Sequence, residues 1–236
     1  MHANSSSIVS RQTEAHAQLQ AVVARHIAHP FRKPVTAYNR AAFEQGLAAW
    51  QASGNKPLIL DAGCGVGLST LHLATQFPDH FVIGIDQSAD RIARNTQWPG
   101  EMPDNFTWVR ADLVDYWRLL LQEKIYPARH YILYPNPWPK IGHLARRWHG
   151  HAVFPTIVAL GGVLECRSNW QIYIDEFAAA LTQVSDIPTH CEAFIAEQPI
   201  TPFERKYRDS GHALWRCRIR LPQTDAAFAA AVRATV

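Results

Sequence analysis

The chain has 236 residues, of which 47% are hydrophobic and 18% charged, and a formal net charge of +3 at pH 7. This composition excludes an intrinsically disordered chain, and the length excludes two full-size enzyme domains. No run of 18 apolar residues is present and the first residues lack the apolar core of a signal peptide, so we expect a cytoplasmic protein without a membrane-spanning segment. The four cysteines form no CxxC pair and the histidines lack ligand spacing, which predicts no metal site.

A basic segment is expected to precede the main domain. Residues 1–10 are polar and Ser-rich, which predicts disorder. Apolar residues at helical spacing predict an amphipathic helix over 11–29, ended by Pro30. Basic residues outnumber acids over 1–36, so this arm either touches phosphate or presents a solvated helix face. We expect a single domain over 37–236.

The rest of the chain alternates short apolar runs with helical patterns. After a helical stretch at 41–52, five apolar runs occur, each followed by a segment able to form a helix: 57–62, 80–86, 106–112, 130–134 and 161–167. This alternation predicts a doubly wound, mostly parallel α/β sheet. The longer run 213–221 has no evident crossover helix before it, which predicts an antiparallel last strand. The Ala-rich tail at 224–235 predicts a closing helix.

A glycine-rich turn follows the first predicted strand, in the segment Leu60-Asp61-Ala62-Gly63-Cys64-Gly65-Val66-Gly67. In open α/β sheets this turn lies at the carboxyl ends of the strands, where ligands bind, and glycines let a ligand approach the backbone. Leu68 stands where the dinucleotide fingerprint G-x-G-x-x-G requires glycine. The spacing instead resembles the S-adenosylmethionine loop of class I methyltransferases.

Acidic residues end the first three predicted strands, where such a cofactor would lie. Asp86 is placed to accept from both ribose hydroxyls, Asp112 to meet the adenine amine, and Asp61 to bind the amino group of the methionine moiety. We therefore predict S-adenosyl-L-methionine as the cofactor. Its predicted contacts are Asp61, Gly63, Gly65, Gly67, Asp86 and Asp112. The alternative is that these acids serve as helix N-caps, a common role of Asp.

Two further blocks indicate the substrate. The first is Tyr134-Pro135-Asn136-Pro137-Trp138-Pro139-Lys140, followed by His143, Arg146, Arg147 and His149. The second is Thr201-Pro202-Phe203-Glu204-Arg205, followed by Gly211-His212-Ala213-Leu214-Trp215. With the glycine turn, these blocks resemble the D-P-W-x-K, T-x-F-E-x-R and G-H-x-x-W elements of the bacterial tRNA (guanine-N7-)-methyltransferase family. The resemblance covers roughly residues 57–221.

The resemblance implies a seven-stranded sheet and methyl transfer from S-adenosylmethionine to guanine N7 in tRNA. Asn136 falls on a catalytic and cofactor-binding position, and the implied substrate contacts are Lys140, His143, Arg146, Asn169, Thr201 and Glu204. Asn136 and Asn169 stand where the family has Asp. Guanine N7 carries a free lone pair, so its attack on the methyl group requires no proton removal, and positioning is the main source of catalysis.

Alternative interpretations stay open for these residues. Asn136-Pro137-Trp138 also resembles the N-P-P-aromatic motif of amino-methyltransferases, in which Asn accepts from an exocyclic amine. The two Asn departures also fit a non-catalytic RNA-binding relative, and a methyltransferase for another base or a small molecule would share the cofactor site. Thr201 would otherwise cap a turn, Glu204 would pair with an Arg, and Lys140, Arg146 and Arg147 would form a solvated helix face or touch phosphate. We expect tRNA as the partner, and a monomer or homodimer.

Overall fold

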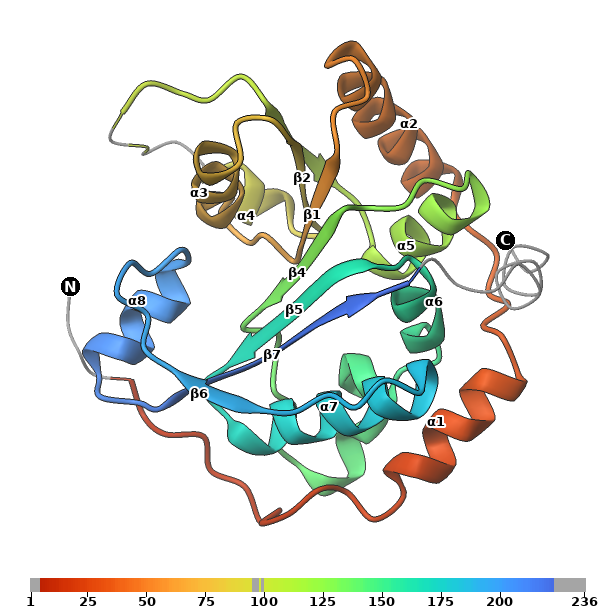
Figure 1. Ribbon diagram of the computed structural model, residues 1–236, viewed down its shortest axis with the longest axis vertical. Helices are drawn as coiled ribbons and strands as arrows, with labels where there is room; N and C mark the ends of the chain where they lie inside the picture. The colour runs from red at the N-terminus through yellow and green to blue at the C-terminus, as the bar shows by residue number, and fades with distance from the viewer. Residues whose placement is uncertain (1–4, 95–97, 99, 223–236) are drawn as a thin grey trace.

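The computed structural model describes residues 5–94, 98 and 100–222. Its centre is a seven-stranded sheet in the order β3-β2-β1-β4-β5-β7-β6 (Figure 1). In chain order the strands are β1 Leu58–Ala62, β2 Phe81–Asp86, β3 Phe106–Arg110, β4 Arg129–Leu133, β5 Gly162–Ser168, β6 Glu192–Phe194 and β7 Leu214–Leu221. Pairing is parallel from β3 to β5, and β7 is antiparallel to both β5 and β6. The predicted fold class is confirmed.

Alternating side chains divide the core between the two faces of the sheet. Leu58 and Leu60 of β1 join the larger buried cluster, whereas Ile59 joins a smaller one with Leu73 of α3. The larger cluster is built with α1 Leu19–Ala28, α2 Ala37–Ala52, α5 Leu113–Gln122, α6 Phe154–Ala159 and α7 Gln171–Ser185. The remaining helices are α3 Leu68–Gln76, α4 Ala89–Ile92, α8 Pro202–Asp209 and the 3-10 turns η1 Ile141–Arg146 and η2 Trp148–Gly150. No helix in the described part of the chain is long and apolar enough to cross a membrane.

The order of the strands determines where a ligand can enter. The chain builds β1, β2 and β3 outward in one direction and then returns to place β4 on the other side of β1. The connections that follow β1 and β4 therefore diverge at the carboxyl edge of the sheet, which is where doubly wound sheets bind ligands. The glycine turn after β1 and the Asn136 segment after β4 consequently face each other across this edge.

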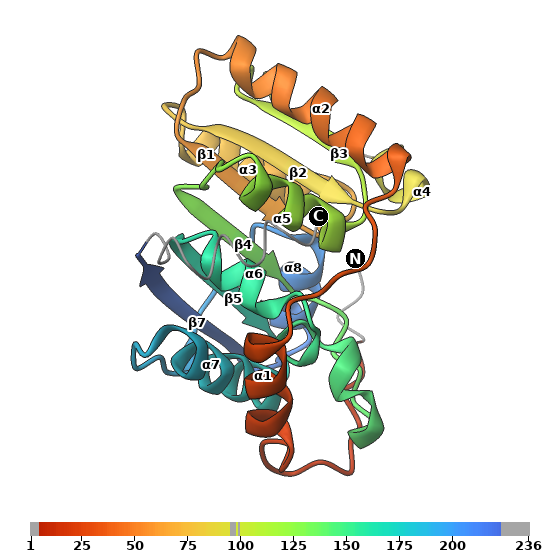
Figure 2. The same ribbon diagram turned by 90° about the vertical axis from the view of Figure 1, so that its right-hand side faces the viewer.

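The N-terminal segment differs from its sequence prediction. The helix predicted over 11–29 begins only at Leu19, and disorder is wrong for residues 5–10, where Ser10 Oγ donates to the carbonyl of Pro139 at 2.6 Å. Leu19 and Val23 enter the main core, and α1 lies beside α7 (Figure 2). The arm and the sheet thus share one core. The separate arm over 1–36 and the domain over 37–236 stay a prediction.

A buried carboxylate anchors the irregular segment before α1. Glu176 of α7 accepts hydrogen bonds from the side chain of Gln12 and the backbone N–H of His16, as well as from Arg147 and His149. These contacts hold residues 12–16 in an irregular path, and the regular helix starts only at Leu19. The interpretation of Arg147 as a phosphate contact is wrong, because its side chain is fully buried on Glu176.

Two elements near the C-terminus were missed by the sequence patterns. α8 precedes β7, although no crossover helix was expected there. Its residues are mostly polar, with Phe203 and Tyr207 as its large apolar side chains, so the segment lacks the broad apolar stripe by which a core helix is recognised. β6 has three residues, too few for a period-two pattern. The helix predicted at 224–235 lies outside the described residues.

Candidate active site

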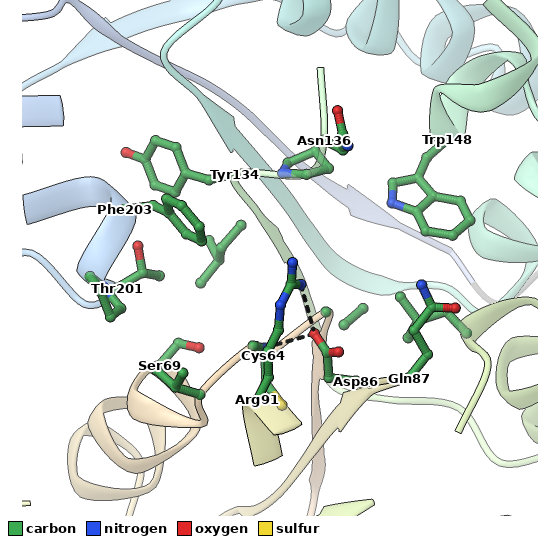
Figure 3. A pocket seen from close by; sticks show the side chains of 18 of the residues that line it. Cys64, Ser69, Asp86, Gln87, Arg91, Tyr134, Asn136, Trp148, Thr201 and Phe203 are labelled. Atoms are coloured by element: carbon green, nitrogen blue, oxygen red, sulfur yellow. Dashed lines mark hydrogen bonds and ion pairs between the residues drawn. The ribbon is translucent and has the colours of Figure 1, made fainter. Parts of the chain in front are cut away.

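A cavity of about 420 Å³ opens at the carboxyl edge of the sheet (Figure 3). This volume is within the range of small-molecule sites. The cavity is lined by segments that follow four strands and by the start of α8, which contribute Gly63, Cys64, Gly65, Asp86, Gln87, Arg91, Asp112, Tyr134, Asn136, Thr201 and Phe203 among others. Residues distant in sequence therefore meet at one place, and most of the predicted cofactor contacts are among them.

The glycines of the turn serve different purposes. Gly65 has φ +60°, and a Cβ added there would meet no heavy atom within 4 Å, so its backbone opens onto the cavity. Gly67 has φ +77°, and a Cβ there would lie 2.3 Å from Nε1 of Trp108 on β3. Gly67 does not line the cavity. Gly65 is therefore suited to close approach by a ligand, whereas Gly67 is required by packing.

Asp86 holds the turn and still faces the cavity. Its Oδ2 accepts from the backbone N–H of Gly65 at 3.0 Å and its Oδ1 from that of Ser88 at 2.8 Å. A carboxylate has about four acceptor sites, so each oxygen keeps capacity for a ligand hydroxyl. Arg91 reaches the same Oδ2 at 3.6 Å. The predicted ribose position is thus compatible with this geometry.

Asp112 combines the two roles considered for it. Its Oδ1 caps α5 by accepting from the N–H of Val114 at 2.7 Å, as the N-cap interpretation expects. The residue also lines the cavity beside Leu113. A cap uses one acceptor site, so capping does not prevent contact with an adenine amine.

Asp61 lies beneath the turn rather than in the cavity lining. It is 1% exposed, and its Oδ2 accepts from the hydroxyls of Ser69 and Thr70 at 2.6 and 2.8 Å. Burial raises its pKa to about 6 despite these two hydrogen bonds, and the charge of Asp86 adds to the shift. Asp61 therefore ties the end of β1 to α3, and Ser69 is the partner that reaches the cavity.

The segment after β4 forms a tight turn around Asn136. Tyr134 and Trp138 have φ of +52° and +45°, a region that non-glycine residues seldom adopt and that is often found at functional sites. Asn136 Oδ1 accepts from the N–H of Trp138 at 3.3 Å, and the exposed amide lines the cavity. The turn therefore presents this side chain between two constrained residues.

Two of the predicted substrate residues pack against the ring of Trp138. Arg146 lies over its ring with the guanidinium carbon 4.8 Å from the centroid, and His143 meets it edge-on at 5.6 Å. Lys140 is exposed at the start of η1. These side chains lie outside the cavity lining and form a basic, aromatic surface next to the Asn136 turn.

The Thr201–Glu204 block is a helix start with its own internal bonding. Thr201 caps α8 by accepting from the N–H of Glu204, and it also lines the cavity. Glu204 is fully buried, and its carboxylate accepts from Tyr134, Arg167 and the N–H of Ile200 at 2.8 to 2.9 Å. Glu204 thus pairs with Arg167, as the alternative interpretation of this residue expects. Burial and the Glu204 charge raise the pKa of Tyr134 far above its usual value, so it stays a donor.

Asn169 lies away from the cavity lining. Its amide nitrogen is 3.1 Å from Nδ1 of His212, the residue of the G-H-x-x-W element, so two predicted motifs meet there. His212 in turn contacts the carbonyl of Ser5 through Nε2 at 2.9 Å. Asn169 thus connects the end of β5 to the N-terminal segment.

Several cavity residues were not singled out from the sequence, namely Gln87, Arg91, Arg94 and Trp148. Gln87 directly follows Asp86, and Arg91 and Arg94 lie on the next turn of chain, so proximity to a strand-end acid was the available signal. Trp148 carries no such local signal. Among the described residues, no group of three or more His, Cys, Asp or Glu side chains is arranged to hold a metal ion.

Alanine at Gly65 and at Gly67 should separate ligand approach from packing. Both substitutions place a side chain at positive φ, but only Gly67→Ala adds an overlap with Trp108. We expect Gly67→Ala to lower the free energy of unfolding by roughly 3 kcal/mol and Gly65→Ala by roughly 1 kcal/mol. Urea unfolding measures both, and calorimetric titration with S-adenosylhomocysteine should show the larger loss of binding for folded Gly65→Ala. Equal stability losses would contradict the packing role of Gly67.

Asp61→Asn should change how stability depends on pH. Since the folded pKa of about 6 exceeds the ordinary value of 3.8, the unfolded chain ionises first as pH rises, and the native state loses stability across this window. Asn keeps an acceptor for Ser69 and Thr70 but does not titrate. We expect its stability relative to the wild type to improve by roughly 2.5 kcal/mol from pH 4 to pH 7.5. A stability difference that is constant with pH in urea unfolding would contradict the raised pKa.

Comparisons with known proteins agree with this arrangement. A family model described as "Putative methyltransferase" matches residues 55–217. The tRNA (guanine-N(7)-)-methyltransferases of Paraburkholderia xenovorans and of a Nocardioides species are 25% and 29% identical, each over 67% of this chain. The matches span 64% and 65% of the relatives' own lengths.

A solved structure shows the same fold. The 16S rRNA (adenine(1408)-N(1))-methyltransferase of Catenulisporales acidiphilia superposes with a TM-score of 0.53 at 16% identity, covering 78% of this chain and 93% of that chain. The family assignment supports the predicted cofactor, S-adenosylmethionine. It also confirms the resemblance drawn from the glycine turn and the two sequence blocks. The chain belongs to the methyltransferase family whose model matches residues 55–217.

Proposed function

We propose that the protein transfers the methyl group of S-adenosylmethionine to N7 of a guanine in tRNA. The observation that carries this proposal is the single cavity that joins the Gly65 turn and Asp86 to the exposed amide of Asn136. The basic surface around Trp138 adjoins it. The tRNA substrate is supported by the names of the relatives described above.

The residues present fit the cofactor. The open backbone at Gly65 admits a close ligand, Asp86 has acceptor capacity for the ribose hydroxyls, and Asp112 lies where an adenine amine would be met. When bound, the cofactor supplies an electrophilic methyl group on a sulfonium. Asp61 remains the predicted partner of the methionine amino group, and a nearby cation would favour its ionised form.

Asn136 is proposed to hold the guanine by its Hoogsteen edge. This edge presents two acceptors, N7 and O6. Oδ1 of Asn136 already accepts from the N–H of Trp138, whereas its amide NH₂ is a donor suited to O6. A carboxylate has no hydrogen to give there. Since N7 needs no deprotonation, orientation of the base by this donor is the chemical contribution we assign to Asn136.

The basic surface is proposed to hold the RNA around the target base. Lys140 and Arg146 would contact backbone phosphates, which position a nucleic acid without reading its sequence. Trp138 and His143 offer ring faces or edges to a neighbouring base. Thr201 is proposed as a direct substrate contact in the cavity, whereas Glu204 and Asn169 act through Tyr134 and His212 respectively.

Transfer of tritiated methyl from S-adenosylmethionine to unmodified tRNA, followed by nucleoside analysis, tests the proposal. We expect label in 7-methylguanosine, with tRNA binding that weakens steeply as salt rises. Label in another nucleoside would replace the target base and keep the cofactor site. Cofactor binding without transfer to any tRNA would contradict the proposal and leave a non-catalytic relative or a small-molecule methyltransferase.

Asn136→Asp should lower methyl transfer rather than raise it. The carboxylate lacks the donor for O6 and places negative charge against two acceptors, so we expect kcat/KM to fall by about tenfold. Cofactor affinity, measured by calorimetry, should change far less. An increase in methyl transfer would show that the Asn is a weakened substitute for the Asp that the sequence resemblance implies at this position, and it would remove the role proposed for its amide.

A further inference from the structure

Two arginines of the cavity have no part in the function proposed above. Arg91 lies on α4 and Arg94 two residues after its end, and both line the cavity with exposed side chains. No carboxylate in the described ranges pairs with Arg94. Arg91 contacts Asp86 Oδ2 at 3.6 Å, and its side chain is 58% exposed (Figure 3). At 3.6 Å the two groups are too far apart for a hydrogen bond, and the exposed guanidinium can exchange buried Asp86 for water.

The charge of these side chains does not suit the cofactor. S-adenosylmethionine carries a sulfonium and an ammonium against a single carboxylate, and this net positive charge does not favour two guanidinium groups in the same cavity. An anion that arrives from outside the cavity is the appropriate partner for Arg91 and Arg94. A guanidinium presents a planar set of donors that matches the oxygens of a phosphate.

The position of α4 indicates which anion arrives. β2 and β4 lie on either side of β1, so α4 after β2 and the Asn136 turn after β4 line the cavity from opposite sides, and η1 follows that turn. Lys140 and Arg146 already give η1 a basic surface. An RNA strand whose base enters the cavity would therefore have a cationic border on each side.

We propose that Arg91 and Arg94 bind a backbone phosphate of the RNA on the α4 side of the cavity, and that cofactor binding frees Arg91 for this contact. The inference rests on the proposed function, because it assumes an RNA substrate. The ribose hydroxyls would use the same Oδ2 of Asp86 that Arg91 now contacts. Occupancy of Asp86 by the cofactor thus weakens the ion pair and strengthens RNA binding. By linkage, RNA must strengthen cofactor binding by the same factor.

Titration of unmodified tRNA over a series of salt concentrations tests the phosphate contact. Arg91→Gln and Arg94→Gln should each lower the slope of log Kd against log salt by about 1. The matched control is Arg220→Gln, because Arg220 is an exposed arginine opposite Val163 at the start of β5, at the far end of the sheet. Its slope should equal that of the wild type. Slopes for Arg91→Gln and Arg94→Gln that equal the control would overturn the proposal.

The coupling is tested by repeating the titrations with saturating S-adenosylhomocysteine. We expect this analogue to tighten tRNA binding about threefold in the wild type and not in Arg91→Gln. Weaker binding of S-adenosylhomocysteine alone to Arg91→Gln would show that Arg91 contacts the cofactor, and would overturn the release step. A wild type that methylates tRNA while both variants keep the full salt slope contradicts only this inference. A wild type that neither methylates nor binds tRNA contradicts the proposed function itself.

Discussion

The buried carboxylate of Glu176 joins the N-terminal segment to the turn that presents Asn136. Burial opposes its ionisation, but hydrogen bonds and charges from His149 and Arg147 lower its pKa to about 2, so it stays an anion. Arg147 then donates onward to the carbonyl of Trp138 at 3.1 Å and to Gln12 at 2.9 Å. Because a buried charge is tolerated only with a full set of partners, these segments must assemble together.

This cluster makes the N-terminal segment part of the site's support. The side chain of Gln12 forms hydrogen bonds with both Arg147 and Glu176. Ser10 Oγ donates to the carbonyl of Pro139 in the Asn136 turn. A segment that looked like a basic arm on composition alone therefore contributes neutral side chains to a buried network. Its basic residues are left at the surface, where the choice between phosphate contact and solvation applies.

Local features were predictable from the sequence and long-range pairings were not. The Gly65 turn is recognised from a strand that runs directly into glycines, and Asp86 from its place at the end of the next strand. Both patterns involve only a few neighbouring residues. Glu204 has partners 37 and 70 residues away in Arg167 and Tyr134, so no spacing indicates its burial. Arg147 lies beside Arg146 in one basic stretch, yet the first is fully buried and the second exposed, which only the packing of α7 decides.

The structural and ligand-binding roles considered for the strand-end acids are compatible. Asp86 and Asp112 each accept hydrogen bonds from backbone N–H groups. These bonds fix the carboxylate in the orientation that a ligand would need. The same carboxylates keep further acceptor capacity, and both residues line the cavity. An acid that caps or braces a turn therefore loses less conformational entropy when a ligand binds than a free side chain would. On the proposed function, the capping by Asp112 and the turn braced by Asp86 prepare the cofactor site. Asp61, which accepts from two hydroxyls behind the turn, supports the same arrangement from the next layer.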